Sequence, residues 1–267
     1  MERSAGVIMH IASLPGKFGI GTFGKEAYDY VEFLFKSGLK YWQILPLGQT
    51  GYGDSPYQSF SAFAGNPYFI DFDILNKEGL LNQEEYIYEN YGDNSEYIDY
   101  GLLFNVKYTV LRRAYNNFKN IDNIYLKEEF NKFNKENEEW LADYSLYMSI
   151  KGKFNLVSWQ EWDEDIKKRE PQAMERYREE LSDEIGFWSF IQFIFFKQWN
   201  ELKSFANEKG IEIIGDMPIY VAEDSADVWS NPEAYLIYSE TLKPISVAGC
   251  PPDAFSATGQ LWGNPLY

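Results

Sequence analysis

Apolar positions at the start of the chain recur with the periods of a strand, a helix and a second strand. Residues 6–11 (GVIMHI) form a short apolar run between turn residues, which is typical of a buried strand. In residues 24–40 apolar side chains return every three or four positions, and Gly38 can end such a helix. Residues 41–47 (YWQILPL) then read as a second buried strand that ends at Pro46. This pattern predicts a βαβ unit with parallel strands.

The middle of the chain has a different character. Residues 76–180 are rich in charge and in helical patterns, and they show no strand-like alternation, so we expect a mostly helical insertion. A long helix is predicted to begin at Ser182 and to end at Gly210. Residues 211–215 (IEIIG) read as a third strand, which places Asp216 at its C-terminal end. Strands that alternate with helices indicate an α/β fold with a parallel sheet.

The last stretch of the chain carries an unusual mixture of residues. Residues 249–267 read GCPPDAFSATGQLWGNPLY, with prolines, glycines, an acid, an amide and a tryptophan. Because proline and glycine oppose helices and central strands, we expect an irregular segment that presents polar groups and flat aromatic faces. Segments of this kind usually carry function rather than packing.

Composition excludes several classes of protein. The formal net charge of −17 argues against nucleic acid and anionic membranes as partners, because both require clusters of Lys and Arg. One cysteine, Cys250, rules out an internal disulfide and is interpreted as a small buried apolar group. No apolar stretch has the length of a membrane helix and no signal-peptide pattern is found, so we expect a soluble, cytoplasmic protein.

Polar and aromatic side chains gather after the predicted strands. Residues 10–21, 52–68 and 216–227 each follow the C-terminal end of a strand, and such ends meet on one face of a parallel sheet. Carboxylates accept hydrogen bonds from sugar hydroxyls and rings stack on sugar faces, so the mixture indicates a carbohydrate site, where paired carboxylates could also cleave a glycosidic bond. The candidates are Tyr52, Asp54, Ser55, Tyr57, Gln58, Asp216, Tyr220, Glu223, Asp224, Trp229, Asp253, Gln260, Trp262 and Asn264.

Several of these residues have a structural interpretation as well. Asp54 fits a turn-capping residue equally well, and Asp216 could order the loop behind its strand. For Asp224 and Ser225 we favour the N-cap of a short helix. His10 is interpreted as a structural histidine with satisfied hydrogen bonds rather than as a catalytic one.

Four motifs in the same order resemble a known family. They read HIASLPGKFGIG, YWQILPLGQTGYGDSPYQSFSAFAGNPYFID, GDMPIYVAEDSADVW and PPDAFSATGQLWGNPLY, and they are similar to the bacterial and plant 4-alpha-glucanotransferases of the alpha-amylase superfamily, called amylomaltase or disproportionating enzyme. The resemblance implies the N-terminal part of a (β/α)8 TIM barrel, incomplete in this chain, with a mostly helical inserted subdomain. The implied segments are 1–75 for the first barrel units, 76–180 for the insertion and 181–267 for the continued barrel.

The resemblance also implies roles for single residues. Tyr57 matches the tyrosine that stacks on the sugar beside the scissile bond, and Asp216 matches an acid that lines that subsite. Asp253, Gln260 and Trp262 match a loop that folds over bound glucan. Further candidate contacts are Tyr52 and Ser55.

The same resemblance sets what is expected of the whole protein. It implies an enzyme that transfers α-1,4-glucan segments by a retaining covalent mechanism, with maltooligosaccharides as partners and with no cofactor or metal. No residue here matches the catalytic motifs of the family, which we expect downstream of residue 267, so the chain alone is expected to be inactive and to need the missing C-terminal half. Ala254 departs from the aromatic residue usual in the family, which puts one loop contact in question. The alternatives are a non-catalytic α-glucan-binding module and a structural fragment.

Overall fold

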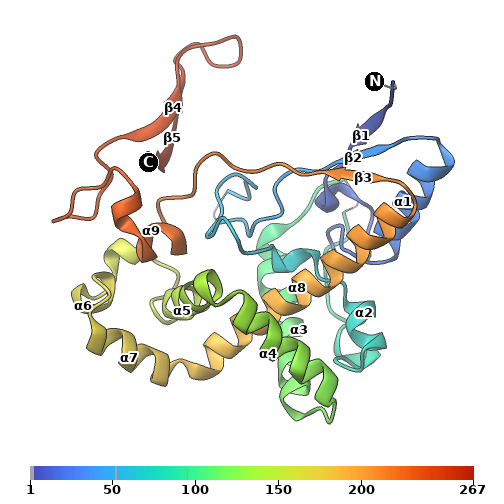
Figure 1. Cartoon of the computed structure of the whole chain (residues 1–267), viewed down its shortest axis with the longest axis horizontal. Helices are drawn as coiled ribbons and strands as arrows, with labels where there is room; N and C mark the ends of the chain where they lie inside the picture. Colours follow the sequence, from blue (N-terminus) through green and yellow to red (C-terminus); the bar gives the residue numbers. More distant parts are fainter. Residues whose placement is uncertain (1–2, 52, 95) are drawn as a thin grey trace. The chain divides into compact units, whose positions relative to one another are not determined.

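The computed structural model describes residues 3–51, 53–94 and 96–267 (Figure 1). This described part divides into two compact units. Unit 1 comprises Met1–Leu47, Gly65–Lys135 and Phe190–Met217, and unit 2 comprises Gly48–Ala64, Glu136–Ser189 and Pro218–Tyr267. Each unit is therefore assembled from segments that lie far apart in the sequence.

Unit 1 is an α/β unit built on a parallel sheet. Within the described part of the chain, the sheet has three strands in the order β1-β2-β3, and both pairs of neighbours are parallel (Figure 1). The predicted βαβ unit and the predicted third strand are thus confirmed. The elements of unit 1 are β1 (Gly6–Ile8), α1 (Lys25–Lys36), β2 (Tyr41–Gln43), α2 (Phe72–Lys77), α3 (Tyr100–Asn120), α4 (Ile124–Glu136, its last residue beyond the unit), most of α8 (Ser182–Glu208) and β3 (Glu212–Ile214).

The two faces of this sheet differ in burial. Val7, Trp42 and Ile213 are neighbours in register on one face, and Trp42 is fully buried, with its indole N–H donating to the carbonyl of Met9. On the other face Ile8 is 64% exposed and Ile214 is 44% exposed. The prediction that the first strand is buried is therefore wrong, because only one face of this short sheet is covered by the described chain.

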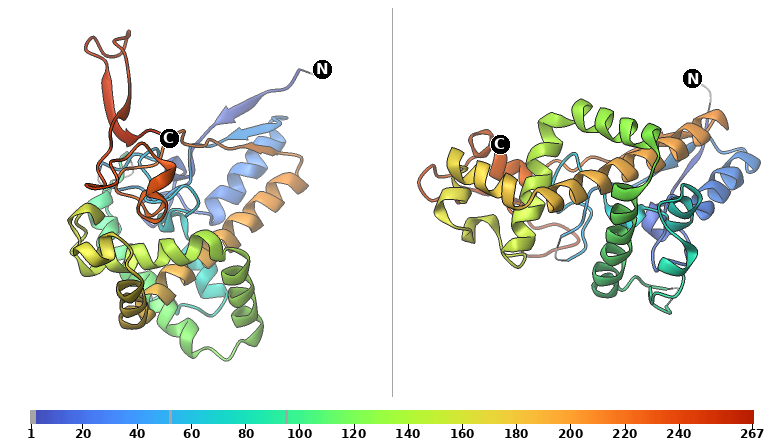
Figure 2. Two further views of the ribbon diagram at one scale, coloured as in Figure 1. Left: turned by 60° about the vertical axis from the view of Figure 1, so that its left-hand side comes forward. Right: turned by 90° about the horizontal axis from the view of Figure 1, so that it is seen from below.

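Helices α1 and α8 pack against each other in unit 1, as both figures show (Figure 2). The rings of Tyr28 on α1 and Phe205 on α8 lie 4.9 Å apart. Just beyond α8, Lys209 forms an ion pair with Glu32 of α1 over 2.5 Å. Both helices end as predicted, since Gly38 and Gly210 adopt the left-handed conformation with φ of 72° and 73°.

Helix α3 brings a buried lysine into the core of unit 1. Lys107 is fully buried, and its ammonium donates to the carbonyl of Tyr68 over 2.8 Å. The same ammonium lies 4.8 Å from the ring centre of Phe72 and 5.7 Å from that of Phe18. Burial lowers the pKa of Lys107 to about 7, against the attraction of Asp71.

Unit 2 combines helices with long loops and ends in a hairpin. Its core includes Trp162 and Trp229, whose rings lie 5.6 Å apart, and Tyr147, which lies 5.9 Å from Trp229. The elements of unit 2 are α5 (Glu138–Lys153), α6 (Glu164–Lys167), α7 (Pro171–Glu180), the start of α8, α9 (Ala226–Ser230), β4 (Val247–Cys250) and β5 (Gln260–Pro265).

The end of the chain differs from its prediction as an irregular segment. β4 and β5 pair in antiparallel fashion, with a register shift between Val247 and Gly249. Gly249 is needed there, because a Cβ on it would lie 2.4 Å from the carbonyl oxygen of Gln260. A two-stranded ribbon tolerates the glycines and the terminal Pro265, since its outer edges carry no ladder bonds that they could interrupt.

The helical character predicted for residues 76–180 is confirmed by α3, α4, α5, α6 and α7. The compact units place α3 and nearly all of α4 in unit 1 and α5 to α7 in unit 2, so the division at residues 75 and 180 stays a prediction. Among the described residues, no helix combines the length and the apolar character required to cross a membrane.

Candidate functional site

The loop Gly48–Ala64 of unit 2 contains Tyr57 and Ser55. The hydroxyl of Ser55 accepts from the backbone N–H of Tyr57 over 3.3 Å, and Thr50 pairs with Ser59 in an antiparallel bridge. Asp54 adopts a left-handed φ of 57° and its N–H donates to the carbonyl of Gly51, which supports its turn interpretation. Tyr57 is 43% exposed, so much of its ring remains accessible. Tyr52 lies outside the described residues.

The same loop is fixed to helix α9. The N–H of Ala226 donates to the carbonyl of Phe60 over 2.8 Å, and the carboxylate of Asp227 accepts from the N–H of Ala62 over 3.1 Å. The ammonium of Lys151 lies 5.3 Å from the ring centre of Phe60. Burial raises the pKa of Asp227, against the hydrogen bonds that it accepts. Hydrogen bonds to α9 therefore hold the loop in place.

The terminal hairpin positions the remaining candidates of unit 2. On β5 the indole N–H of Trp262 donates to the side-chain oxygen of Gln260 over 3.0 Å, so the two candidate side chains hold each other. Trp262 is 43% exposed. Between the strands, the carboxylate of Asp253 accepts from the N–H groups of Phe255 and Ser256, both at 2.8 Å. In this structure Asp253 thus orders its own loop.

The structure brings the Tyr57 loop and β5 together. Gln58 donates through Nε2 to the side-chain oxygen of Asn264 over 2.9 Å and to the carbonyl of Trp262 over 3.2 Å. Both residues belong to unit 2, in which Tyr57, Ser55, Asp253, Gln260 and Trp262 also lie.

Asp216 lies in unit 1. It follows β3 after one residue, Gly215, and is exposed, which agrees with its predicted place at the C-terminal end of the third strand. Its convergence with Tyr57 and Trp262 stays a prediction, since those residues belong to unit 2.

One candidate, Trp229, belongs to the interior, and another, Glu223, is hydrogen-bonded within unit 2. Trp229 is buried, its indole N–H donates to the carbonyl of Ile166, and the guanidinium of Arg169 lies 4.4 Å from its ring centre. The prediction that Trp229 offers a ligand-facing ring is therefore wrong. Glu223 accepts through its carboxylate from the side-chain amide of Gln160 over 2.7 Å.

The N-cap predicted for residues 224 and 225 is correct for Ser225 but not for Asp224. Ser225 caps α9 as predicted, with its hydroxyl accepting from the N–H of Val228. Asp224 accepts instead from the ammonium of Lys151 and the hydroxyl of Tyr147, both at 2.5 Å. Both partners lie on α5, 73 and 77 positions away, so no local pattern could have indicated them.

His10 differs from its prediction as a hydrogen-bonded structural residue. Its Nδ1 is buried and has no hydrogen-bond partner among the described residues. Burial lowers the pKa of its imidazole to about 4, and its ring meets that of Phe69 edge-on at 5.4 Å. His10 is thus a neutral packing residue at neutral pH. Cys250 is only half-buried, so its prediction as a buried apolar group is also wrong.

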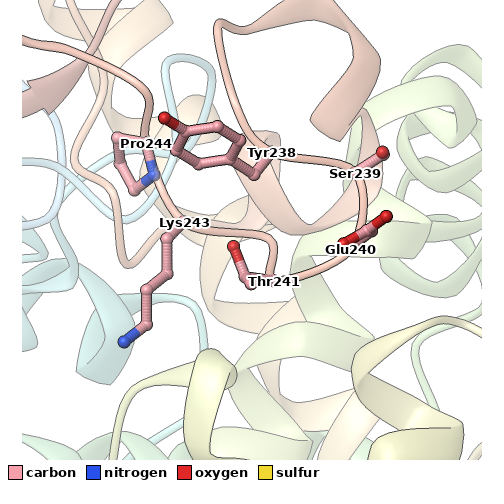
Figure 3. A pocket seen from close by; sticks show the side chains of 6 residues that line it. All are labelled: Tyr238, Ser239, Glu240, Thr241, Lys243 and Pro244. Atoms are coloured by element: carbon pink, nitrogen blue, oxygen red, sulfur yellow. The ribbon is translucent and has the colours of Figure 1, made fainter.

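A surface hollow of about 570 Å³ lies elsewhere in unit 2 (Figure 3). The turn around it adopts a left-handed φ of 55° at Leu242, and the carbonyl of that residue accepts from Gln160 over 2.9 Å. None of the candidate residues that the structure describes lines the hollow. Its lining residues are Tyr238, Ser239, Glu240, Thr241, Lys243 and Pro244. Across the described ranges, no group of three or more His, Cys, Asp or Glu side chains could hold a metal ion.

Known structures share this α/β fold. An amylomaltase from Streptococcus agalactiae, solved in complex with acarbose, superposes with a TM-score of 0.95 at 48% sequence identity, over 100% of this chain and 53% of that one. An amylomaltase from Corynebacterium glutamicum, at 18% identity and a TM-score of 0.77 over 99% of this chain and 36% of that one, agrees in fold.

Sequence comparison identifies the family of the chain. The 4-alpha-glucanotransferase of Clostridium butyricum is 60% identical over 259 residues, which are 97% of this chain and 52% of that protein. The 4-alpha-glucanotransferase of Thermus thermophilus is 47% identical over 267 residues, 100% of this chain and 52% of that protein. The family profile described as 4-alpha-glucanotransferase matches residues 9–267, so the chain belongs to this family. It spans about half the length of the curated relatives that it matches.

Proposed function

We propose that this chain is the N-terminal part of a 4-alpha-glucanotransferase, which moves segments of α-1,4-glucan from one chain to another by a retaining covalent mechanism. The observation that carries the proposal is the family match over residues 9–267, together with the 48% identity to an amylomaltase that binds acarbose. The three-stranded parallel sheet of the described chain is then the beginning of a (β/α)8 barrel, and the exposed Ile8 and Ile214 face its interior.

The geometry of unit 2 supports glucan binding. Tyr57 and Trp262 keep accessible rings on segments that are joined through Gln58, and the flat faces of such rings suit the apolar faces of sugars. Gln260 is held against Trp262 and adds an amide beside the ring. Asp216 is the carboxylate that we expect to complete the subsite.

A titration with maltoheptaose tests the binding surface. We expect the tryptophan fluorescence of the chain to change on binding, and the affinity to fall about two- to twelvefold in Tyr57→Ala and in Trp262→Ala, because each lost ring contact contributes about 0.5–1.5 kcal/mol. The control is Tyr125→Ala, which removes an exposed tyrosine of α4 in unit 1. Equal losses in all three variants would contradict the assignment.

Transfer itself is proposed to need residues outside this chain. The nucleophile and the general acid are expected in the missing half of the protein, so we expect the 267-residue chain to bind glucan without converting maltotriose into longer oligosaccharides. Product analysis by chromatography measures this directly. Longer oligosaccharides formed by the chain alone would overturn this part of the proposal. Binding by the chain with no transfer by the full-length protein would favour a glucan-binding module instead.

A further inference from the structure

Two side-chain amides join segments of unit 2 that lie 206 positions apart. Nε2 of Gln58 donates to Oδ1 of Asn264 over 2.9 Å, and Nδ2 of Asn264 lies 3.4 Å from Oε1 of Gln58. The two amides therefore pair in both directions, as two bases do. Gln58 is half-buried, whereas Asn264 is only 3% exposed.

Further hydrogen bonds fix the orientation of the pair. Nδ2 of Asn264 donates to the carbonyl of Val221 over 2.7 Å, and Val221 is itself buried. Nε2 of Gln58 donates a second bond, to the carbonyl of Trp262 over 3.2 Å. Turning either amide around would set donor against donor or acceptor against acceptor. Both amides are thus engaged within the protein, and a role as sugar ligands, which their residue types alone suggested, is not favoured.

The position of the pair connects the two aromatic residues of the proposed binding surface. Gln58 directly follows Tyr57, and its side chain holds the backbone of Trp262. Trp262 in turn holds Gln260 through its indole N–H. A shift of the Tyr57 loop relative to β5 would therefore have to break the amide pair.

We propose that Gln58 and Asn264 are positioning residues, which lock the loop of Tyr57 to the strand of Trp262 so that both rings meet a glucan in one preset arrangement. The inference deepens the proposed function and rests on it for the identity of the ligand. Preset rings lower the ordering cost of binding, which is the general benefit of a preorganised site.

The first experiment monitors the contact between the loop of Tyr57 and β5 in the absence of sugar. The chain is labelled with 5-fluorotryptophan, and the fluorine resonance of Trp262 is assigned by its loss in Trp262→Phe. In Gln58→Met, which keeps the length of the side chain and removes its amide, we expect this resonance to shift or to broaden, while those of the buried Trp42 and Trp159 stay in place. In Gln58→Glu a carboxylate faces two acceptor oxygens, so a larger change is expected.

A matched control separates positioning from general stability. Gln160 is also a half-buried amide of unit 2, and it bonds Glu223 over 2.7 Å and the carbonyl of Leu242 over 2.9 Å. Gln160→Met removes an equivalent pair of hydrogen bonds and is expected to leave the Trp262 resonance unchanged. An unchanged resonance in both Gln58 variants, or an equal shift in the control, would overturn the inference.

The second experiment measures the consequence for binding. The dissociation constant for maltoheptaose is expected to rise at least fivefold in Gln58→Met and to stay within twofold in Gln160→Met. Equal affinity in Gln58→Met and in the unaltered chain would overturn the positioning role. Absence of binding in the unaltered chain would contradict the proposed function and the glucan as ligand. The fluorine resonance alone would then test whether Gln58 fixes the loop of Tyr57 to β5.

Discussion

The carboxylate of Asp224 is expected to be one of the most important polar groups for the stability of unit 2. It accepts from the ammonium of Lys151 and the hydroxyl of Tyr147, both at 2.5 Å, and from the N–H of Trp159 at 3.3 Å. The side chain of Lys151 is only 3% exposed, so its charge has little water around it. Asp224→Asn removes the negative charge opposite this buried ammonium. We expect a loss of about 3–5 kcal/mol in the free energy of unfolding, which is the usual cost of an uncompensated buried charge.

A double-mutant cycle isolates the interaction. Lys151→Met leaves the carboxylate, which is about a third exposed and keeps two hydrogen bonds, so its loss should be smaller, at about 1–3 kcal/mol. Combining it with Asp224→Asn should cost less than the sum of the two, because no unpaired charge then remains. Urea denaturation followed by tryptophan fluorescence measures all three variants, since Trp159 and Trp229 are buried in the same unit.

An exposed ion pair supplies the control. Lys25 and Asp29 are four residues apart on α1 and both side chains are well exposed, so Asp29→Asn is expected to leave the unfolding midpoint unchanged within error. A midpoint for Asp224→Asn as high as that of the control would refute the reasoning. So would strict additivity of the two single changes in unit 2.

Three further predictions follow from unit 1 and from α5. The pKa of Lys107 is about 7 in the folded chain and near 10.5 when unfolded, so the unfolded chain binds more protons between these two values and stability rises with pH. In urea denaturation, the free energy of unfolding should therefore rise between pH 7.5 and 9 by about 2 kcal/mol more than that of Lys107→Met. A constant difference between the two proteins would refute this. His10 is the one histidine of the sequence, so its imidazole protons can be followed by NMR, and they should titrate near pH 4 rather than 6.5. Gly65→Ala would place a Cβ 2.1 Å from the ring of Phe195 and should lower the free energy of unfolding by about 1–3 kcal/mol, a loss that Phe195→Leu should partly restore. Gly152→Ala is the control, because no described heavy atom lies within 4 Å of its Cβ, and it should be neutral or slightly stabilising. Thermal unfolding measures all of these variants.

The sheet of unit 1 could be predicted because its signals are local. Apolar runs marked each strand, and glycines marked the ends of α1 and α8, where the left-handed conformation at Gly38 and Gly210 requires them. Strand length was less predictable. Residues 6–11 read as one apolar run, yet β1 covers Gly6–Ile8 and Ile11–Ser13 forms a short helical turn, because apolar character records burial and not ladder pairing.

The candidate site could be predicted only as a set of residue types. Tyr57, Gln260 and Trp262 were identified from motifs, and the structure adds the hydrogen bonds that hold the last two together. The sequence does not show which polar side chains already have hydrogen-bond partners inside the protein. Gln58 and Asp224 both appeared as candidate ligands, and both find their partners more than 70 positions away.

One disagreement between the sequence and the structure supports the proposed barrel. Ile8 and Ile214 lie in one row of the sheet on either side of Gln43, and both are exposed, although residues 6–11 have the continuous apolar character of a fully buried strand. A strand that evolved with one face in water would alternate polar and apolar residues. The β1 sequence GVI shows no such alternation, and β3 places only Glu212 toward the exposed face before Ile214. The exposed face thus carries two isoleucines beside Gln43 and Glu212, and the remaining strands of a (β/α)8 barrel would cover these isoleucines.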